Sequence, residues 1–221
     1  MRPDARSLIL DLDGTLIDSR PGILESFSAA VTVVFAGRAF DLSSVVLGPP
    51  IKRMFQISFP EASEAEIDGL NRIFREHYDR EGWLHTRLYE GLCDVLTHCQ
   101  SQGLVLHIAT NKPLHISTAI LAHLGIEHYF RSILAADSVQ PPFASKASMI
   151  ENLLKSHQVN RGETIYVGDS SEDAAACAAC GIRFVWAAYG YGKLTKNEAK
   201  EAFATIHRPG VLTALLKAKT V

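Results

Sequence analysis

The chain has 221 residues, 47% hydrophobic and 21% charged, which is long enough to bury a substantial core and to hold one domain plus an insertion. A formal net charge of -2, with no basic block, argues against nucleic acid as an obligatory partner. No apolar run approaches the roughly 20 residues that span a bilayer, so we expect no membrane partner. The four cysteines favour reduced thiols, and we expect a cytoplasmic protein that is a monomer or a homodimer.

The first predicted strand, Ser7–Leu10, ends on a carboxylate, Asp11. Asp13 follows two residues later, and Gly14 then predicts a turn. Residues i and i+2 of a strand point the same way, so the two acids are expected to face one small volume unless the turn re-aims Asp13. Such a pair rarely serves packing, because buried carboxylates are costly unless they are paired or bound to a metal. The pair suits a site that holds a hard cation while one acid attacks and the other moves protons.

Residues 20–86 contain no clear strand pattern, unlike the rest of the chain, and predict a helical insert. We expect a helix over residues 21–36 with proline in its first turn, and a shorter helix over residues 50–59. The capping box Ser63-Glu64-Ala65-Glu66 opens a third helix that runs to residue 80. We therefore predict an all-helical cap domain, residues 20–86, above the sheet edge at which open α/β sheets bind ligands.

Strands and helices alternate after residue 86. Further strands are expected over residues 104–110, 131–135, 164–168 and 182–187, and helices over residues 90–102, 113–124 and 170–180. A glycine follows each of these helices, as a left-handed C-terminal cap requires. The alternation predicts an α/β fold, a Rossmann-like doubly wound parallel sheet core built from residues 1–19 and 87–221. The tail, with a short helix over residues 209–217, is expected to cover the sheet edge.

Further polar groups stand at or after the predicted strand ends. Thr110 and Asn111 follow one strand, Asp169 and Asp173 follow another, and Lys146 lies between them in the chain. Together with the first two acids they supply carboxylates, a hydroxyl, an amide and a fixed cation. This is the set that phosphoryl transfer needs, because positioning and electrostatics do most of the work in that reaction.

These motifs resemble those of the haloacid dehalogenase superfamily, in its large phosphatase branch. The family's DxDGT motif matches residues 11–15, its second motif matches Thr110, its third motif matches Lys146, and its GDxxxD motif matches residues 168–173. The third motif departs from a frequent lysine-proline form, since alanine follows Lys146. Three more stretches look like variants of those in phosphoglycolate phosphatases and relatives, some of which are nucleotidases: Gly48-Pro49-Pro50-Ile51, Thr110-Asn111-Lys112-Pro113 and Tyr189-Gly190-Tyr191-Gly192.

The resemblance implies a phosphatase that hydrolyses a small-molecule phosphate monoester, with Mg2+ as cofactor and an aspartyl-phosphate intermediate. Asp11 would be the nucleophile and Asp13 the group that carries the proton. The metal would be held by Asp11, by the backbone carbonyl of Asp13 and by Asp169.

The resemblance also implies which residues bind the transferring phosphoryl group: Thr110, Asn111 and Lys146. Asp173 is a further candidate, expected to orient Lys146 or a metal-bound water. Lys112 either points into the site or faces solvent, and the sequence does not choose between the two.

Other functions stay open at this stage. A 5'-nucleotidase or a phosphomutase would use the same fold, and a non-catalytic phosphate-binding module is a less favoured alternative. A dehalogenase is disfavoured, since hydrolysis of a carbon–halogen bond has no need for Asp13 as an acid. Cys177 and Cys180 form a CxxC pair inside an alanine-rich helix, where packed thiols are a better interpretation than a redox or zinc site.

Overall fold

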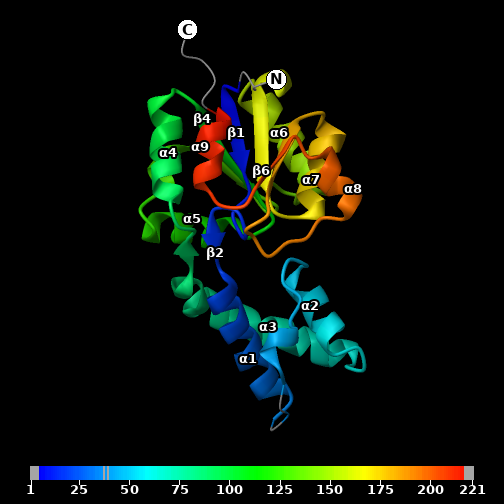
Figure 1. The fold of residues 1–221 in the computed structure, drawn as a ribbon. Helices are drawn as coiled ribbons and strands as arrows, with labels where there is room; N and C mark the ends of the chain where they lie inside the picture. The colour runs from blue at the N-terminus through cyan, green and yellow to red at the C-terminus, as the bar shows by residue number, and fades with distance from the viewer. Residues whose placement is uncertain (1–4, 37, 39, 217–221) are drawn as a thin grey trace. The chain divides into compact units, whose positions relative to one another are not determined.

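The computed structural model describes residues 5–36, 38 and 40–216 of the chain (Figure 1). The chain divides into two compact units. One consists of Met1–Asp18 together with Leu88–Val221, and the other consists of Ser19–Arg87. Within the described residues, no helix combines the length and the apolar character that crossing a bilayer requires.

The first unit is built on a parallel sheet. In the described part of the chain, six strands pair in the order β5-β4-β1-β6-β7-β8. The strands are β1 (Ser7–Leu10), β4 (Val105–Thr110), β5 (Phe130–Ala135), β6 (Thr164–Gly168), β7 (Arg183–Ala187) and β8 (Ala204–Ile206). The predicted doubly wound α/β fold is confirmed. The sequence did not predict β8, which extends the sheet beyond β7 as a further parallel strand.

Helices pack on both sides of this sheet. They are α4 (Leu92–Ser101), α5 (Leu114–His123), α6 (Lys146–Ser156), α7 (Ser171–Cys180), α8 (Lys196–Glu201) and α9 (Gly210–Leu216). Figure 1 shows α4 and α9 on one side of the sheet and α6 and α7 on the other. The glycines predicted to end α4, α5 and α7 have left-handed backbone angles, with φ of 71°, 69° and 62° at Gly103, Gly125 and Gly181. The last residue of the predicted 209–217 helix lies outside the described residues.

An apolar cluster fixes α6 and α7 against the sheet. Ile9 and Tyr166, from the central strands β1 and β6, pack there with Met149 and Leu153 of α6 and Cys177 of α7. Cys177 and Cys180 are buried free thiols, and burial raises the pKa of each of them. The interpretation of the CxxC pair as packed thiols therefore agrees with the structure. This packing determines where the first residues of α6 and α7 lie, and those residues contribute to the site described below.

Among its described residues between 20 and 86, the second unit contains helices joined by turns and loops, and no strand. It contains α1 (Arg20–Val34), α2 (Ile51–Ser58) and α3 (Glu64–Arg80), with short 3-10 turns η1 (Leu42–Ser44) and η2 (Gly82–His85). The capping box predicted at Ser63 is present, with Ser63 Oγ accepting from the Glu66 N–H at 3.3 Å. Phe27 of α1 stacks on Phe55 of α2, with ring centroids 4.2 Å apart.

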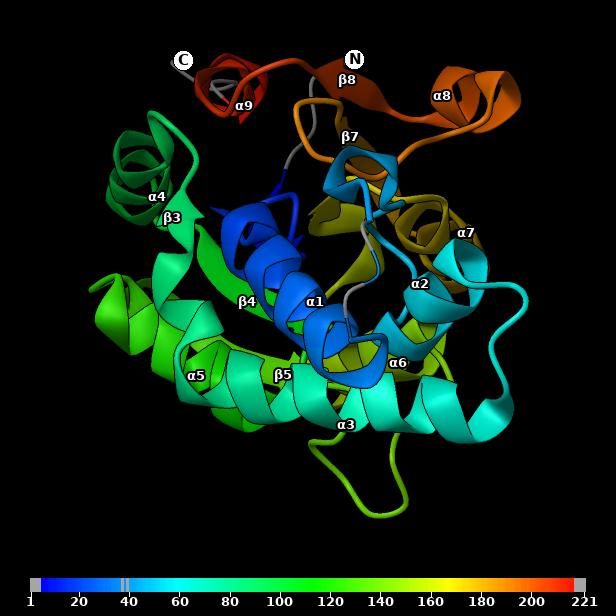
Figure 2. The same ribbon diagram turned by 90° about the horizontal axis from the view of Figure 1, so that it is seen from below.

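The helices α1 and α3 lie side by side in Figure 2. The turn after α3 approaches α1 so closely that a Cβ on Gly22 would stand 1.9 Å from the Gly82 carbonyl oxygen. Two short strands, β2 (Ile17–Asp18) and β3 (Arg87–Leu88), form a separate two-stranded sheet.

Candidate active site

Two of the predicted acids lie at the same edge of the sheet because their strands are neighbours. Leu10 at the end of β1 is paired in register with Val167 of β6, and Asp11 and Asp169 follow directly after these strands. The Asp11 N–H donates to the Val167 carbonyl at 2.9 Å and continues the pairing past the end of β1. Parallel strands in register bring their carboxyl ends together, so both carboxylates are directed to one place.

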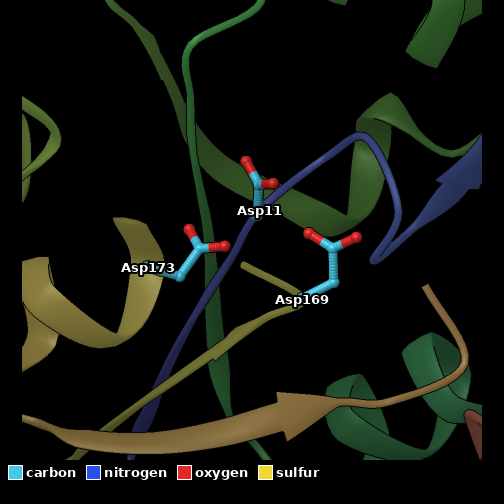
Figure 3. A group of neighbouring side chains, drawn as sticks. All are labelled: Asp11, Asp169 and Asp173. Carbon is cyan, nitrogen blue, oxygen red and sulfur yellow. The ribbon is translucent and has the colours of Figure 1, made fainter. Parts of the chain in front are cut away.

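Asp173, in the first turn of α7, completes a group of three buried acids. One carboxylate oxygen from each of Asp11, Asp169 and Asp173 lies within 4.8 Å of the others. Figure 3 shows the three side chains converging from β1, from the end of β6 and from α7. Oxygen ligands gathered in this way are what hard divalent cations such as Mg2+ prefer, so this group can hold a metal ion.

Lys146 joins two of these acids. It is the first residue of α6, its side chain is 3% exposed, and its Nζ lies 2.9 Å from Asp11 Oδ1 and 2.5 Å from Asp173 Oδ1. The lysine predicted from the third motif therefore lies beside the predicted nucleophile. Asp173 contacts the same lysine, and its predicted role of orienting Lys146 or a metal-bound water stays a prediction.

A buried hydrogen-bond network holds Asp173 in place. Its Oδ2 accepts from the Ser170 N–H at 3.0 Å and from Ser170 Oγ at 2.6 Å, and its Oδ1 accepts from the Tyr166 hydroxyl at 2.8 Å. The Tyr166 ring also lies 5.7 Å from Lys146 Nζ. A Cβ on Gly168 would stand 2.5 Å from the Asp173 carboxyl carbon, so this position has no room for a side chain. Sequence reasoning did not identify Tyr166 as part of the site.

The electrostatics of the group favour a dication. Burial raises the pKa of Asp11 to about 8, against the attraction of Lys146, and it raises the pKa of Asp169 to about 6. Burial also opposes ionisation of Asp173, but the ion pair and hydrogen bond with Lys146 outweigh it and lower the pKa of this acid. When all are ionised, three carboxylates and one ammonium carry a net charge of minus two. A bound dication would neutralise that charge and favour the ionised carboxylates.

Asp169 is held by the loop that follows β7. The Gly192 N–H donates to Asp169 Oδ2 at 2.7 Å, and Trp186 Nε1–H donates to the Asp169 carbonyl at 3.1 Å. A Cβ on Gly190 would stand 2.3 Å from the Gly14 carbonyl oxygen and 2.5 Å from Asp169 Oδ2. The sequence singled out this glycine-rich stretch only for its family resemblance. The structure gives it a physical role, since it confines one carboxylate of the acidic group.

Asp13 lies apart from the three acids that gather in the described residues. Its chain turns at Gly14, whose φ is 77° and whose N–H donates to the Ile17 carbonyl at 2.9 Å. The Asp13 carboxylate lies 3.1 and 3.2 Å, through Oδ1 and Oδ2, from Lys112 Nζ. The turn therefore re-aims Asp13, which the sequence had left open, and Lys112 points into the site.

Thr110 and Asn111 lie at the same edge of the sheet, at the end of β4. Thr110 is buried, and its Oγ1 accepts from the Lys112 N–H at 3.2 Å. Asn111 Nδ2 donates to Glu172 Oε2 at 2.9 Å, which ties the turn after β4 to the first turn of α7. The sequence did not predict a contact for Glu172.

Comparison with known proteins agrees with this architecture. The family model described as haloacid dehalogenase-like hydrolase matches residues 8–187. The tyrosine-protein kinase PtkA of Mycobacterium tuberculosis is 32% identical over 188 residues, which cover 84% of this chain and 63% of that protein. The chain thus spans less than two thirds of the length of PtkA. A phosphoglycolate phosphatase of Agrobacterium fabrum is 30% identical over 200 residues, which cover 86% of this chain and 83% of the relative.

A solved structure shows the same fold. A haloacid dehalogenase-like family protein from Streptococcus pneumoniae superposes with a TM-score of 0.84 at 24% identity, covering 97% of this chain and 99% of the other. The residues that the family model matches include the three acids and Lys146. The chain therefore belongs to the haloacid dehalogenase-like hydrolases, the family that its motifs resemble.

Proposed function

We propose that this protein is a Mg2+-dependent phosphatase that hydrolyses a small-molecule phosphate monoester through an aspartyl-phosphate intermediate, in the manner of a phosphoglycolate phosphatase. The observation that carries the proposal is the buried group of Asp11, Asp169 and Asp173 around Lys146. Buried acids in this number are costly to a fold unless a cation and a reaction make use of them. The phosphoglycolate phosphatase among the relatives supports the choice of substrate class.

In the first half of the reaction, a carboxylate oxygen of Asp11 attacks phosphorus and the bond from phosphorus to the ester oxygen breaks. Asp13 gives a proton to the departing alkoxide. Thr110 Oγ1 and the Asn111 N–H bind phosphoryl oxygens as charge moves onto them. Lys146 offsets the negative charge that Asp11 and the phosphoryl group bring together.

In the second half, Asp13 takes a proton from a water molecule, which attacks the phosphorus of the aspartyl-phosphate. The bond from phosphorus to Asp11 then breaks, and inorganic phosphate and the free carboxylate are restored. Throughout, Asp173 keeps Lys146 in position. Mg2+, held by Asp11, Asp169 and the Asp13 backbone carbonyl, would supply charge neutralisation at the phosphoryl oxygens.

Phosphate release, measured with and without EDTA, tests the proposal. The panel contains 2-phosphoglycolate, sugar phosphates, nucleoside monophosphates and p-nitrophenyl phosphate. We expect turnover that EDTA abolishes and that added Mg2+ restores. Asp11→Asn should abolish turnover of every ester, and Lys155→Gln on the exposed side of α6 should leave it unchanged. Normal Mg2+-dependent turnover by Asp11→Asn would refute the nucleophile assignment.

The panel also separates the alternatives. A nucleotidase would prefer nucleoside monophosphates, a phosphomutase would need a bisphosphate to start turnover, and a binding module would release no phosphate. The assignment of residues 20–86 as the cap that selects substrate, the monomer-or-homodimer state and the cytoplasmic location stay predictions.

A further inference from the structure

The turn that carries Asp13 holds its shape through its own backbone hydrogen bonds. The Leu12 carbonyl accepts from the Leu16 and Ile17 N–H groups, at 2.9 and 3.0 Å. We call residues 12–17 the acid turn. Because the acid turn is this compact, a contact to one of its backbone groups also affects where the Asp13 carboxylate lies.

The loop after β7 contacts the acid turn at two neighbouring carbonyl groups. The Tyr189 hydroxyl donates to the Thr15 carbonyl at 2.8 Å. The backbone of the next residue lies so close that a Cβ on Gly190 would stand 2.3 Å from the Gly14 carbonyl oxygen. Tyr189 and Thr15 are 174 residues apart in the chain, so their hydrogen bond depends on the tertiary fold and not on a local turn.

The same loop also holds an acid of the candidate metal-binding group. The Gly192 N–H donates to Asp169 Oδ2 at 2.7 Å. Residues 189–192 therefore contact the acid turn through one end and Asp169 through the other. In the proposed mechanism Asp13 serves the leaving group and Asp169 serves the metal, so this loop determines how those two groups are spaced.

The ring and the hydroxyl of Tyr189 make separate contacts. The ring packs edge-on against the Tyr89 ring, with centroids 4.9 Å apart and an interplanar angle of 69°. The hydroxyl bonds to the Thr15 carbonyl. Replacing Tyr189 by phenylalanine therefore removes the bond to the acid turn and keeps the packing of the two rings.

We propose that Tyr189 is a positioning residue for proton transfer, whose hydroxyl holds the acid turn in the place from which Asp13 gives a proton to the departing oxygen. This inference rests on the proposed function and adds to it a residue that acts through Asp13. Proton transfer by a well-placed group contributes about 100- to 10,000-fold to a rate, and a small displacement of that group removes much of the gain.

The effect depends on the leaving group of the ester. An alkoxide is strongly basic and leaves slowly without a proton, whereas p-nitrophenolate is a weak base and leaves without one. A displaced Asp13 therefore slows the hydrolysis of alkyl phosphates and leaves that of p-nitrophenyl phosphate nearly unchanged. A general loosening of the site slows both reactions, because both need the nucleophile, Lys146 and the metal.

Steady-state kinetics of Tyr189→Phe on p-nitrophenyl phosphate and on one alkyl ester test the proposal. The alkyl ester is whichever of 2-phosphoglycolate, glucose 6-phosphate and adenosine 5'-monophosphate the wild type hydrolyses fastest. We measure kcat/KM, because it covers the step in which the ester bond breaks. We expect it to fall about 10- to 100-fold for the alkyl ester and by less than about threefold for p-nitrophenyl phosphate.

Two further variants and one further measurement calibrate the result. Asp13→Asn removes the proton donor and should show the same dependence on the ester, with larger losses. Tyr129→Phe removes a hydroxyl that hydrogen-bonds to Thr97 Oγ1 of α4 at 2.8 Å, and it should leave both rates unchanged. Thermal unfolding at increasing Mg2+ concentration should give Tyr189→Phe the midpoint of the wild type, because the Gly192 backbone N–H is retained.

The outcomes separate this proposal from the proposed function. If Tyr189→Phe lowers both rates by one factor, lowers neither, or raises the Mg2+ midpoint, the positioning role is wrong and the phosphatase proposal stands. If Asp13→Asn lowers both rates equally, Asp13 is not the proton donor and the proposed mechanism fails at that step. If the wild type hydrolyses none of the esters, the phosphatase proposal itself fails.

A second variant decides the question should Tyr189→Phe not fold. The methyl group of Gly190→Ala would stand 2.3 Å from the Gly14 carbonyl oxygen, so it displaces the same loop from the acid turn. At saturating Mg2+ this variant should also lose more activity on the alkyl ester than on p-nitrophenyl phosphate. Equal losses on the two esters would refute the positioning role.

Discussion

A methyl group on Gly190 should weaken metal binding although none of the three acids is itself substituted. Gly190 lies in the loop after β7, and a Cβ there would stand 2.5 Å from Asp169 Oδ2 and 2.3 Å from the Gly14 carbonyl oxygen. Neither neighbour is the far end of a flexible chain, because Asp169 is held by the Gly192 N–H and the Gly14 oxygen is backbone. Gly190→Ala must therefore displace Asp169, the loop, or both.

The size of the effect follows from the geometry. Ordinary contact begins near 3.4 Å, so the carboxylate and the new methyl group must separate by about 0.9 Å. Mg2+ tolerates little distortion of its octahedral shell, and loss of a group that orients a ligand typically costs 10- to 100-fold in metal affinity. We expect the apparent dissociation constant for Mg2+ to rise by that factor, which is about 1.4 to 2.7 kcal/mol.

Thermal unfolding at increasing Mg2+ concentration measures this constant without catalysis, since a ligand that binds the folded state raises Tm. Gly210→Ala is the matched control, because no atom lies within 4 Å of a Cβ at that position. The wild type and Gly210→Ala should respond to Mg2+ at the same concentrations, and Gly190→Ala only at higher ones. An unchanged Mg2+ midpoint in a folded Gly190→Ala protein would refute the argument that this loop confines Asp169.

Three further predictions concern stability and rate. Burial lowers the pKa of His107 to about 4, so below pH 6.5 the unfolded chain binds more protons than the folded chain. The free energy of unfolding that is present above pH 6.5 is therefore lost in part as the pH falls toward 4. This loss should be about 3 kcal/mol smaller in His107→Gln than in the wild type, as measured by denaturant unfolding. Gly22→Ala should lower the free energy of unfolding by about 3 kcal/mol in the same assay, because its Cβ would stand 1.9 Å from a carbonyl oxygen. The control Gly69→Ala has its nearest contact at 3.7 Å and should raise that free energy by up to about 1 kcal/mol. Tyr166→Phe should lower kcat about tenfold and leave KM little changed, because the lost hydroxyl donates to Asp173 and does not bind the substrate. Steady-state kinetics on p-nitrophenyl phosphate would measure kcat and KM separately.

The sequence predicts the buried strands well because their burial leaves a clear pattern. The run over residues 164–168 is apolar and β-branched and is buried at every position, and its predicted bounds equal those of β6. Strand β8 has no such pattern. It has three residues, of which only Ile206 is buried, and its pairing with β7 depends on the path of the preceding loop.

The acids of the site are predictable for a related reason. Asp11 and Asp169 each come directly after a buried strand, and parallel neighbours bring their carboxyl ends together whatever the loops do. The groups that hold the acids are not predictable in this way. Gly192 is 23 residues from Asp169, and Lys112 is 99 residues from Asp13, so both contacts depend on loop paths that no local pattern specifies.

The two lysines of the site contact acids that have different roles in the proposed reaction. Lys146 lies between two acids, so when Asp11 becomes esterified in the proposed mechanism, Asp173 remains as its counter-charge. The charge that Lys146 meets therefore changes little from one substrate to another. Lys112 faces an acid that must turn to the ester oxygen and exchange protons during each cycle. The two lysines therefore act on different steps of the proposed reaction, since Lys146 balances the charge of the nucleophile and Lys112 contacts the acid that exchanges protons.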